Sequence, residues 1–141
     1  MITKSIILAG REVPLKTIEN YILFLRKPIR TQDIGGFDNE RSRLHNAIFN
    51  SAGLQDGKFA KARNIGYGAD LNDPIEAPYG RFNDALENLL CDALACPVCG
   101  KTLDRNQKCM RPLCANYGRL ITGRECVKTL HRIAIDTREI K

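Results

Sequence analysis

The chain has 141 residues, with 22 Lys and Arg against 16 Asp and Glu, which gives a formal net charge of +6 at pH 7. A content of 43% hydrophobic residues is enough for one packed core with a small module attached. No stretch approaches the roughly 18 to 20 apolar residues that cross a bilayer, so we expect no membrane-spanning segment and no membrane partner. Residues 1–20 lack a basic start followed by a long apolar run, so we expect a cytoplasmic protein.

The first half of the chain predicts a mixed α+β core domain over residues 1–95. Residues 5–15 predict a β-hairpin, because a β-branched apolar run is followed by a glycine-containing turn and a second short run. Thr17 predicts the start of a helix over 18–27, although its apolar run also fits a buried strand. Asp38 predicts the cap of a short helix through about Asn50.

Residues 55–79 read as a long loop, because glycines and prolines interrupt them throughout. The loop mixes basic and aromatic side chains, which fits either an ordinary surface loop or a segment that follows a phosphate backbone. From about Pro78 or Arg81 to Ala95, apolar residues recur at helical spacing and predict an amphipathic helix. Cys91 lies beside that stripe, and we expect it to be buried as a small hydrophobic residue.

Four cysteines follow this helix with the spacing C-x2-C-x9-C-x4-C, namely Cys96, Cys99, Cys109 and Cys114. Two close pairs of thiolates can complete a tetrahedron around one Zn²⁺, so these four are the predicted metal ligands. Four sulfur ligands leave no open position for water, and the predicted zinc is therefore structural. An iron–sulfur cluster, a redox pair and disulfides are the alternatives, and disulfides fit a cytoplasmic chain poorly.

The run Cys-Pro-Val-Cys-Gly at residues 96–100, together with the two later cysteines, resembles the short zinc-ribbon, or C4 zinc-finger, family. Its second half, with Cys114-Ala115-Asn116-Tyr117-Gly118, looks more like the knuckle of topoisomerase-type zinc fingers. The resemblance covers residues 96–118 only and implies the four metal ligands. Such ribbons bind DNA, RNA or proteins, or brace a fold.

Residues 119–141 predict a basic C-terminal helix that packs on the core. Thr122 and Glu125 have the spacing of a capping box, in which each side chain satisfies a backbone N–H at the helix start. Cys126 falls on the inward face, while Arg124, Lys128 and Arg132 recur every four residues on an outward edge. Aligned cations repel each other, and a polyanion would relieve that repulsion, although a solvated basic face also fits.

The positive charge is concentrated in this part of the chain. Residues 1–95 have twelve basic and twelve acidic side chains, whereas residues 96–141 have ten basic and four acidic ones. We therefore predict nucleic-acid contacts in the C-terminal third. The predicted contact residues are Lys101, Arg105, Lys108, Arg111, Tyr117, Arg119, Arg124, Lys128 and Arg132.

The sequence offers little that predicts catalysis. His45 and His131 lie in separate predicted helices, and we expect His45 at a helix surface. The leading hypothesis is a non-catalytic, DNA-binding or RNA-binding zinc-ribbon protein with an accessory or regulatory role. The second is a protein-interaction adaptor or inhibitor that docks on a larger enzyme through the ribbon. The weakest is a metal-dependent nuclease, in which Asp70, Asp73 and Glu76 would bind Mg²⁺.

Overall fold

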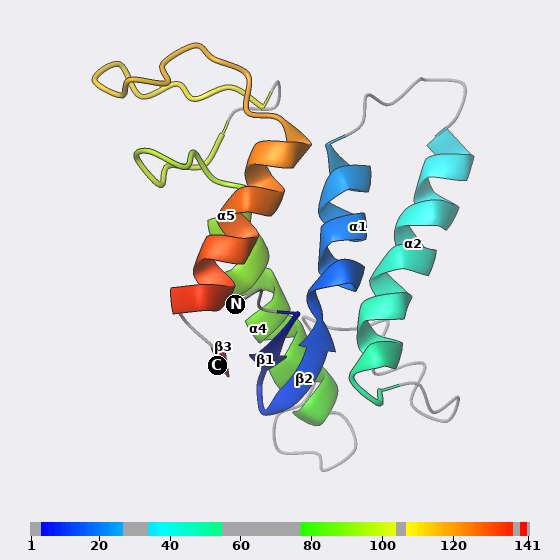
Figure 1. Cartoon of the computed structure of the whole chain (residues 1–141). Coiled ribbons are helices and arrows are strands. Elements are labelled where there is room, and N and C mark those ends of the chain that lie inside the picture. The colour runs from blue at the N-terminus through cyan, green and yellow to red at the C-terminus, as the bar shows by residue number, and fades with distance from the viewer. Residues whose placement is uncertain (1–3, 27–33, 55–76, 104–106, 137–138, 141) are drawn as a thin grey trace.

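The computed structural model describes residues 4–26, 34–54, 77–103, 107–136 and 139–140 (Figure 1). Along the chain its elements are β1 (Ser5–Leu8), β2 (Arg11–Pro14), α1 (Leu15–Leu25), α2 (Ile34–Ser51), α4 (Ala77–Ala93), α5 (Gly123–Asp136) and β3 (Glu139–Ile140). The predicted α+β class and N-terminal antiparallel hairpin are confirmed. The sequence did not reveal β3, which is only two residues long.

The strands form one small sheet in the order β2-β1-β3. β1 pairs antiparallel with β2, where Ile6 lies opposite Val13, and parallel with β3, where Ile7 lies opposite Glu139. A two-residue turn joins the hairpin, and both of its residues, Ala9 and Gly10, have positive φ. This backbone matches the right-handed twist of paired strands, and it holds the short hairpin in register.

One hydrophobic core joins the sheet to all four described helices. α1 lies between α2 and α5, and α4 packs against α5 and the sheet (Figure 1). The largest fully buried side chains are Phe49, Phe82, Ile6, Leu8, Leu15, Ile18, Ile22, Ile48, Leu86, Leu89, Ile121 and Leu130. Because Leu130 of α5 belongs to this set, the C-terminal helix shares its core with the first half of the chain.

Two helix starts differ from the sequence prediction. α1 begins at Leu15, so Thr17 lies within its first turn, where the hydroxyl donates a hydrogen bond to the Pro14 carbonyl at 2.8 Å. α2 begins at Ile34, before the predicted cap at Asp38. α4 begins at Ala77, next to Pro78, the earlier of its two predicted starts, and so takes in the end of the segment predicted as loop. The remainder of that loop, residues 55–76, lies outside the described residues, as do the three carboxylates of the nuclease hypothesis.

His45 was predicted at a helix surface and Cys91 in the core, and both side chains take other positions. The imidazole of His45 is half-buried, with its centroid 5.6 Å from that of Tyr21 and 5.0 Å from that of Phe49. Cys91 is exposed instead of buried, because it lies on the opposite side of α4 from Leu89 and Ala93. It lines an open groove of about 350 Å³ beside Arg26 and Leu103.

The segment between α4 and α5 forms a separate lobe, which we call the cysteine lobe (residues 96–121). It projects from one end of the helices, on the side away from the β-hairpin (Figure 1). Its described residues contain two isolated β-bridges, between Lys108 and Leu120 and between Cys109 and Tyr117. Among the helices that the structure describes, none is long and apolar enough to span a membrane.

Candidate metal centre

The cysteine lobe brings together the four predicted ligands, whose sulfur atoms all lie within 4.8 Å of one another. The Sγ atoms of Cys96 and Cys114 are 3.8 Å apart, and those of Cys99 and Cys109 are 3.7 Å apart. A tetrahedron with metal–sulfur bonds of about 2.3 Å has edges of about 3.8 Å. These two sulfur–sulfur distances match the edges of that tetrahedron, and the cluster could hold one metal ion.

Tight turns present the sulfurs from both sides of the cluster. In the first turn the Gly100 N–H donates to the Cys96 carbonyl at 2.9 Å, and Gly100 has a φ of +72°. In the second, the Tyr117 N–H donates to the Cys114 carbonyl at 3.0 Å, and Gly118, which closes this turn, has a φ of +77° and donates its N–H to the Cys109 carbonyl at 2.7 Å. Glycine adopts this left-handed backbone without steric cost, which explains why each turn contains one.

Backbone and side-chain N–H groups point at two of the sulfurs. The Asn116 backbone N–H donates to Cys114 Sγ at 3.3 Å, and its side-chain amide donates to Cys96 Sγ at 3.7 Å. Burial disfavours the Cys96 thiolate, but hydrogen bonds from the backbone of Cys99 and Val98 and from Asn116 outweigh it and lower the pKa of Cys96 to about 6. The site thus favours one thiolate before any cation binds.

Cys109 behaves in the opposite way. The backbone of Arg111 favours its thiolate, but burial and hydrogen bonding with the three neighbouring sulfurs prevail and raise the pKa of Cys109 to about 12. Four thiols this close cannot all ionise unless a cation neutralises them. A metal ion that binds thiolates would supply that positive charge. With four cysteine sulfurs as ligands, a tetrahedral ion would have no coordination position left for water.

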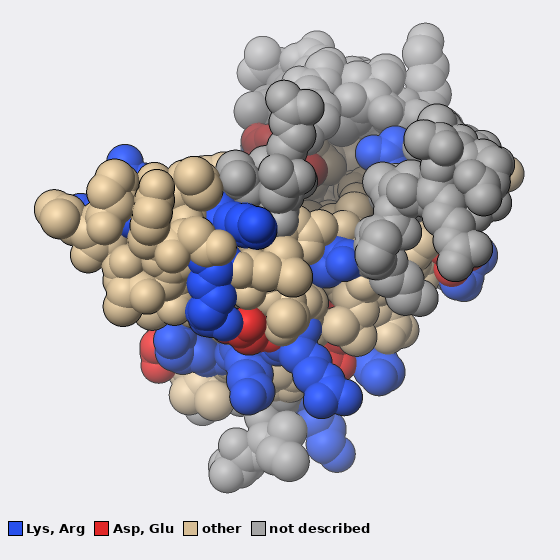
Figure 2. Space-filling view, turned by 90° about the horizontal axis from the view of Figure 1, so that it is seen from above, with Lys and Arg blue, Asp and Glu red and all other residues tan. Residues whose placement is uncertain are grey.

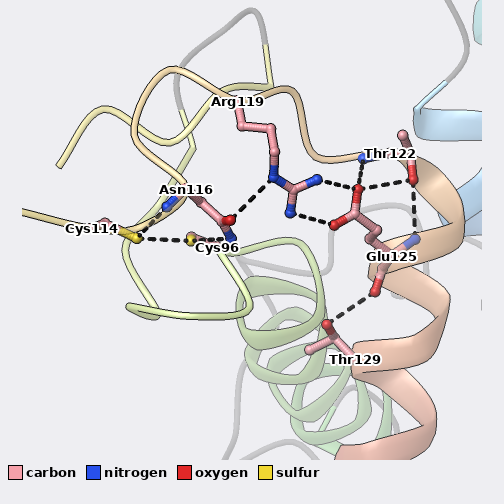
Figure 3. Close-up of polar contacts among 7 residues, drawn as sticks. All are labelled: Cys96, Cys114, Asn116, Arg119, Thr122, Glu125 and Thr129. Carbon is pink, nitrogen blue, oxygen red and sulfur yellow. Dashed lines mark hydrogen bonds and ion pairs between the residues drawn. The ribbon is translucent and has the colours of Figure 1, made fainter. Parts of the chain in front are cut away.

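Asn116 also connects the sulfur cluster to the first turn of α5 (Figure 3). Its side-chain oxygen accepts a hydrogen bond from Arg119 Nε at 3.1 Å. The Arg119 guanidinium in turn donates to both carboxylate oxygens of Glu125, at 3.0 and 2.7 Å. We call this chain of contacts the Asn116–Arg119–Glu125 network. It explains how the lobe is fixed relative to the helix that follows it.

Glu125 completes the capping box that the sequence predicts. Its carboxylate accepts from the Thr122 backbone N–H at 3.3 Å, and the Glu125 N–H donates to the Thr122 hydroxyl at 3.3 Å (Figure 3). The hydrogen bond from Arg119 and, more weakly, those from Thr122 lower the pKa of Glu125, although burial opposes them. The sequence indicated the capping box but not Asn116 or Arg119 as its link to the metal site, because no local spacing rule joins them.

The predicted nucleic-acid contacts occupy two neighbouring surfaces. On the cysteine lobe, Lys101, Lys108, Arg111 and Tyr117 are exposed, and on α5, Arg124, Lys128 and Arg132 are exposed. Arg119 is half-exposed and forms the ion pair with Glu125, and Arg105 lies outside the described residues. Seen from above, blue side chains gather beside and below the largely tan lobe, with few red ones among them (Figure 2).

The other cysteines and the histidines lie apart from the sulfur cluster. Cys126 is buried, as predicted, and burial raises its pKa, although the nearby Arg26 guanidinium acts against that shift. His131 forms an ion-pair contact with Glu19, which joins α5 to α1. Within the described ranges, the four lobe cysteines are the sole group of three or more side chains placed to bind a metal.

No family model matches the chain, and no curated protein or solved structure is significantly similar to it.

Proposed function

We propose that the sulfur cluster holds one structural Zn²⁺ in a zinc ribbon, and that the protein binds nucleic acid without catalysis through the adjoining cationic surface. Zinc accepts four thiolates in a tetrahedron and has no redox chemistry of its own. Thiolates of this kind persist where cysteines stay reduced, which is the reason for assigning the protein to the cytoplasm. Because four thiolates would fill every position on the metal, none would be left for catalysis. We therefore assign the protein an accessory or regulatory role in nucleic-acid metabolism.

The charge arrangement on α5 is the observation that carries the nucleic-acid proposal. Arg124, Lys128 and Arg132 are exposed at successive four-residue intervals, opposite the buried face of the helix. Glu125 is the sole acidic residue among the described residues from 96 to 135, and its carboxylate is bound to Arg119. Asp136, four residues after Arg132 on α5, is the other acidic side chain beside the stripe, which has three cations against this one exposed carboxylate and so keeps a net positive charge to be neutralised.

Phosphate groups would supply that neutralisation. Four residues of helix rise about 6 Å, so the three cations follow a line along which a charged backbone can lie. Contacts of this type release counterions, and they give affinity that falls steeply with salt and depends little on base sequence. We therefore expect binding to both single strands and duplexes, with the main phosphate contacts on α5.

Fluorescence anisotropy with a labelled single strand and a labelled duplex tests this proposal. The variant Arg124→Glu, Lys128→Glu, Arg132→Glu is compared with a matched variant in which the exposed Lys4, Lys16 and Arg81 are changed to Glu. Between about 50 and 200 mM salt, we expect the α5 variant to reduce the slope of log affinity against log salt by about 2 to 3. The matched variant has the same net charge and should retain most of the slope.

Two results would contradict the nucleic-acid proposal. One is wild-type affinity that stays flat over this salt range, and the other is an equal loss in both charge-reversed variants. The second result would mean that net charge alone, and not the α5 stripe, determines binding.

The zinc assignment has its own test. Elemental analysis of the purified chain should find one equivalent of zinc, and a strong chelator should lower its melting temperature. An equivalent of iron, or a melting temperature that the chelator leaves unchanged, would show that the assignment is wrong.

A further inference from the structure

The cysteine lobe exposes an unusual share of the apolar side chains that the structure describes. Of the seven large hydrophobic residues exposed in the described ranges, five belong to the lobe: Val98, Met110, Leu113, Tyr117 and Leu120. Leu113 is 94% exposed and Val98 is 62% exposed. A cluster of exposed apolar side chains on a small lobe is typical of a binding surface, whereas single exposed residues are ordinary.

These five residues all belong to the small lobe that surrounds the sulfur cluster. Val98, Met110 and Leu113 are each the direct chain neighbour of a cysteine whose sulfur lies within 4.8 Å of the others. Tyr117 is bridged to Cys109, and Leu120 is bridged to Lys108. We call this set the apolar tip. It projects from the body of the molecule and does not contribute to the core (Figure 1).

The charges around the apolar tip select the kind of partner. Lys101, Lys108 and Arg111 are exposed beside it, and the described residues from 96 to 124 include no acidic side chain. A second copy of this chain would bring two cationic rims together, which like-charge repulsion opposes. A partner with acidic residues around apolar anchors would complement both the tip and its rim.

The composition of the tip argues for a protein and against bases as its partner. Four of its five side chains are aliphatic, and Tyr117 is its one aromatic residue. Bases stack on aromatic faces, which aliphatic side chains do not offer. Methionine and tyrosine are enriched in protein interfaces, and a few anchors supply most of the binding energy there.

We propose that the apolar tip is a docking surface for a protein segment with aliphatic or aromatic anchors flanked by Asp and Glu. The segment inserts its anchors between Val98 and Leu113, and its carboxylates pair with the cationic rim. This interaction does not depend on nucleic-acid binding by α5. The protein would then connect a nucleic acid on one surface to a protein partner on the other.

Selection from a phage-displayed library of random linear peptides tests the proposal, with the full metal-loaded chain as bait. Enriched peptides should contain Leu, Ile or Phe flanked by Asp or Glu. The double variant Val98→Ser, Leu113→Ser should bind them at least about tenfold more weakly. Ile135→Ser is the matched control, because Ile135 is 61% exposed but lies on α5, and it should bind as the wild type does. Lys101→Glu combined with Arg111→Glu should also weaken binding.

The proposal is wrong if no peptide is enriched, if the enriched peptides lack acidic residues, or if the double variant binds them as tightly as Ile135→Ser does. The same variants are assayed with an oligo-dT strand, with a duplex and with phosphatidylserine vesicles. Selective loss of oligo-dT or vesicle binding in the double variant, or self-association of the wild type that this variant abolishes, would assign the tip to another partner and overturn the proposal. Unchanged nucleic-acid binding with lost peptide binding supports it.

Discussion

Asn116 gives the sharpest test of how the protein supports its metal centre. Its side chain is 9% exposed and has two contacts, one from the amide nitrogen to Cys96 Sγ at 3.7 Å and one from Arg119 to its oxygen at 3.1 Å. Asn116→Ala removes both contacts and leaves the backbone N–H that donates to Cys114. We expect the variant to fold but to hold the metal more weakly.

The expected magnitude follows from the geometry. Loss of a hydrogen bond to a metal ligand reduces metal affinity about 10- to 100-fold. The nitrogen–sulfur distance of 3.7 Å is longer than the 3.3 Å of the backbone contact, which places the loss near the lower end of that range. A tenfold weaker affinity corresponds to about 1.4 kcal/mol less metal-linked stability at saturating metal. Asn116→Asp should be worse, because it places a carboxylate beside thiolates.

Competition with a colorimetric zinc chelator measures the affinity, and thermal unfolding at several zinc concentrations measures the linked stability. Asn88→Ala is the matched control, because Asn88 is an exposed asparagine on α4. If Asn116→Ala and Asn88→Ala have the same zinc affinity, Asn116 does not support the ligands and the reasoning fails. The same conclusion follows if Asn116→Asp binds zinc as tightly as the wild type.

Three further predictions concern the thiols and the core. The pKa of Cys109 is raised to about 12, so zinc uptake at neutral pH should release protons and the zinc affinity should fall as the pH is lowered. A pH indicator in weak buffer measures the release. Zinc uptake without proton release would contradict this prediction. Gly123→Val should lower the free energy of unfolding, measured in urea, by about 1 to 3 kcal/mol, since even a Cβ there would lie 3.2 Å from both Leu23 and Arg26. An unchanged midpoint of urea unfolding would show that α1 and α5 separate easily. Leu86→Ala, at a fully buried position, should cost about 2 to 5 kcal/mol in the same assay, whereas a loss below 1 kcal/mol would mean that the core closes around it.

The sequence predicted best where a local rule applies. The hairpin, the apolar stripe of α4 and the Thr122–Glu125 capping box each depend on residues within one element, and each is present. The spacing of the four cysteines was equally informative, because two close pairs predict that the segment folds back and brings the four sulfurs together. Helix starts were less predictable, and α2 begins before the aspartate that has a suitable side chain for capping.

Long-range contacts were not predictable in this way. β3 pairs with β1 across almost the whole chain, and its two residues carry no strand pattern. Arg26, just after α1, is half-buried and donates to the Leu94 carbonyl at 2.9 Å, across 68 residues of chain. Such a contact depends on the packing of α1 against α4, and no spacing within either helix indicates it.

The Asn116–Arg119–Glu125 network suggests why a metal centre and a cationic helix adjoin each other. The network joins sulfur ligands to the capping box of α5, and the same carboxylate that starts the helix neutralises Arg119. Metal binding would therefore fix the lobe against the helix, and with it the apolar tip against the stripe of Arg124, Lys128 and Arg132. Two surfaces held in a fixed relation bind more tightly than two independent surfaces to partners that are joined to each other, because the second contact is then intramolecular. Loss of the metal would therefore weaken binding of a peptide tethered to a nucleic acid more than it weakens binding of nucleic acid to α5 alone.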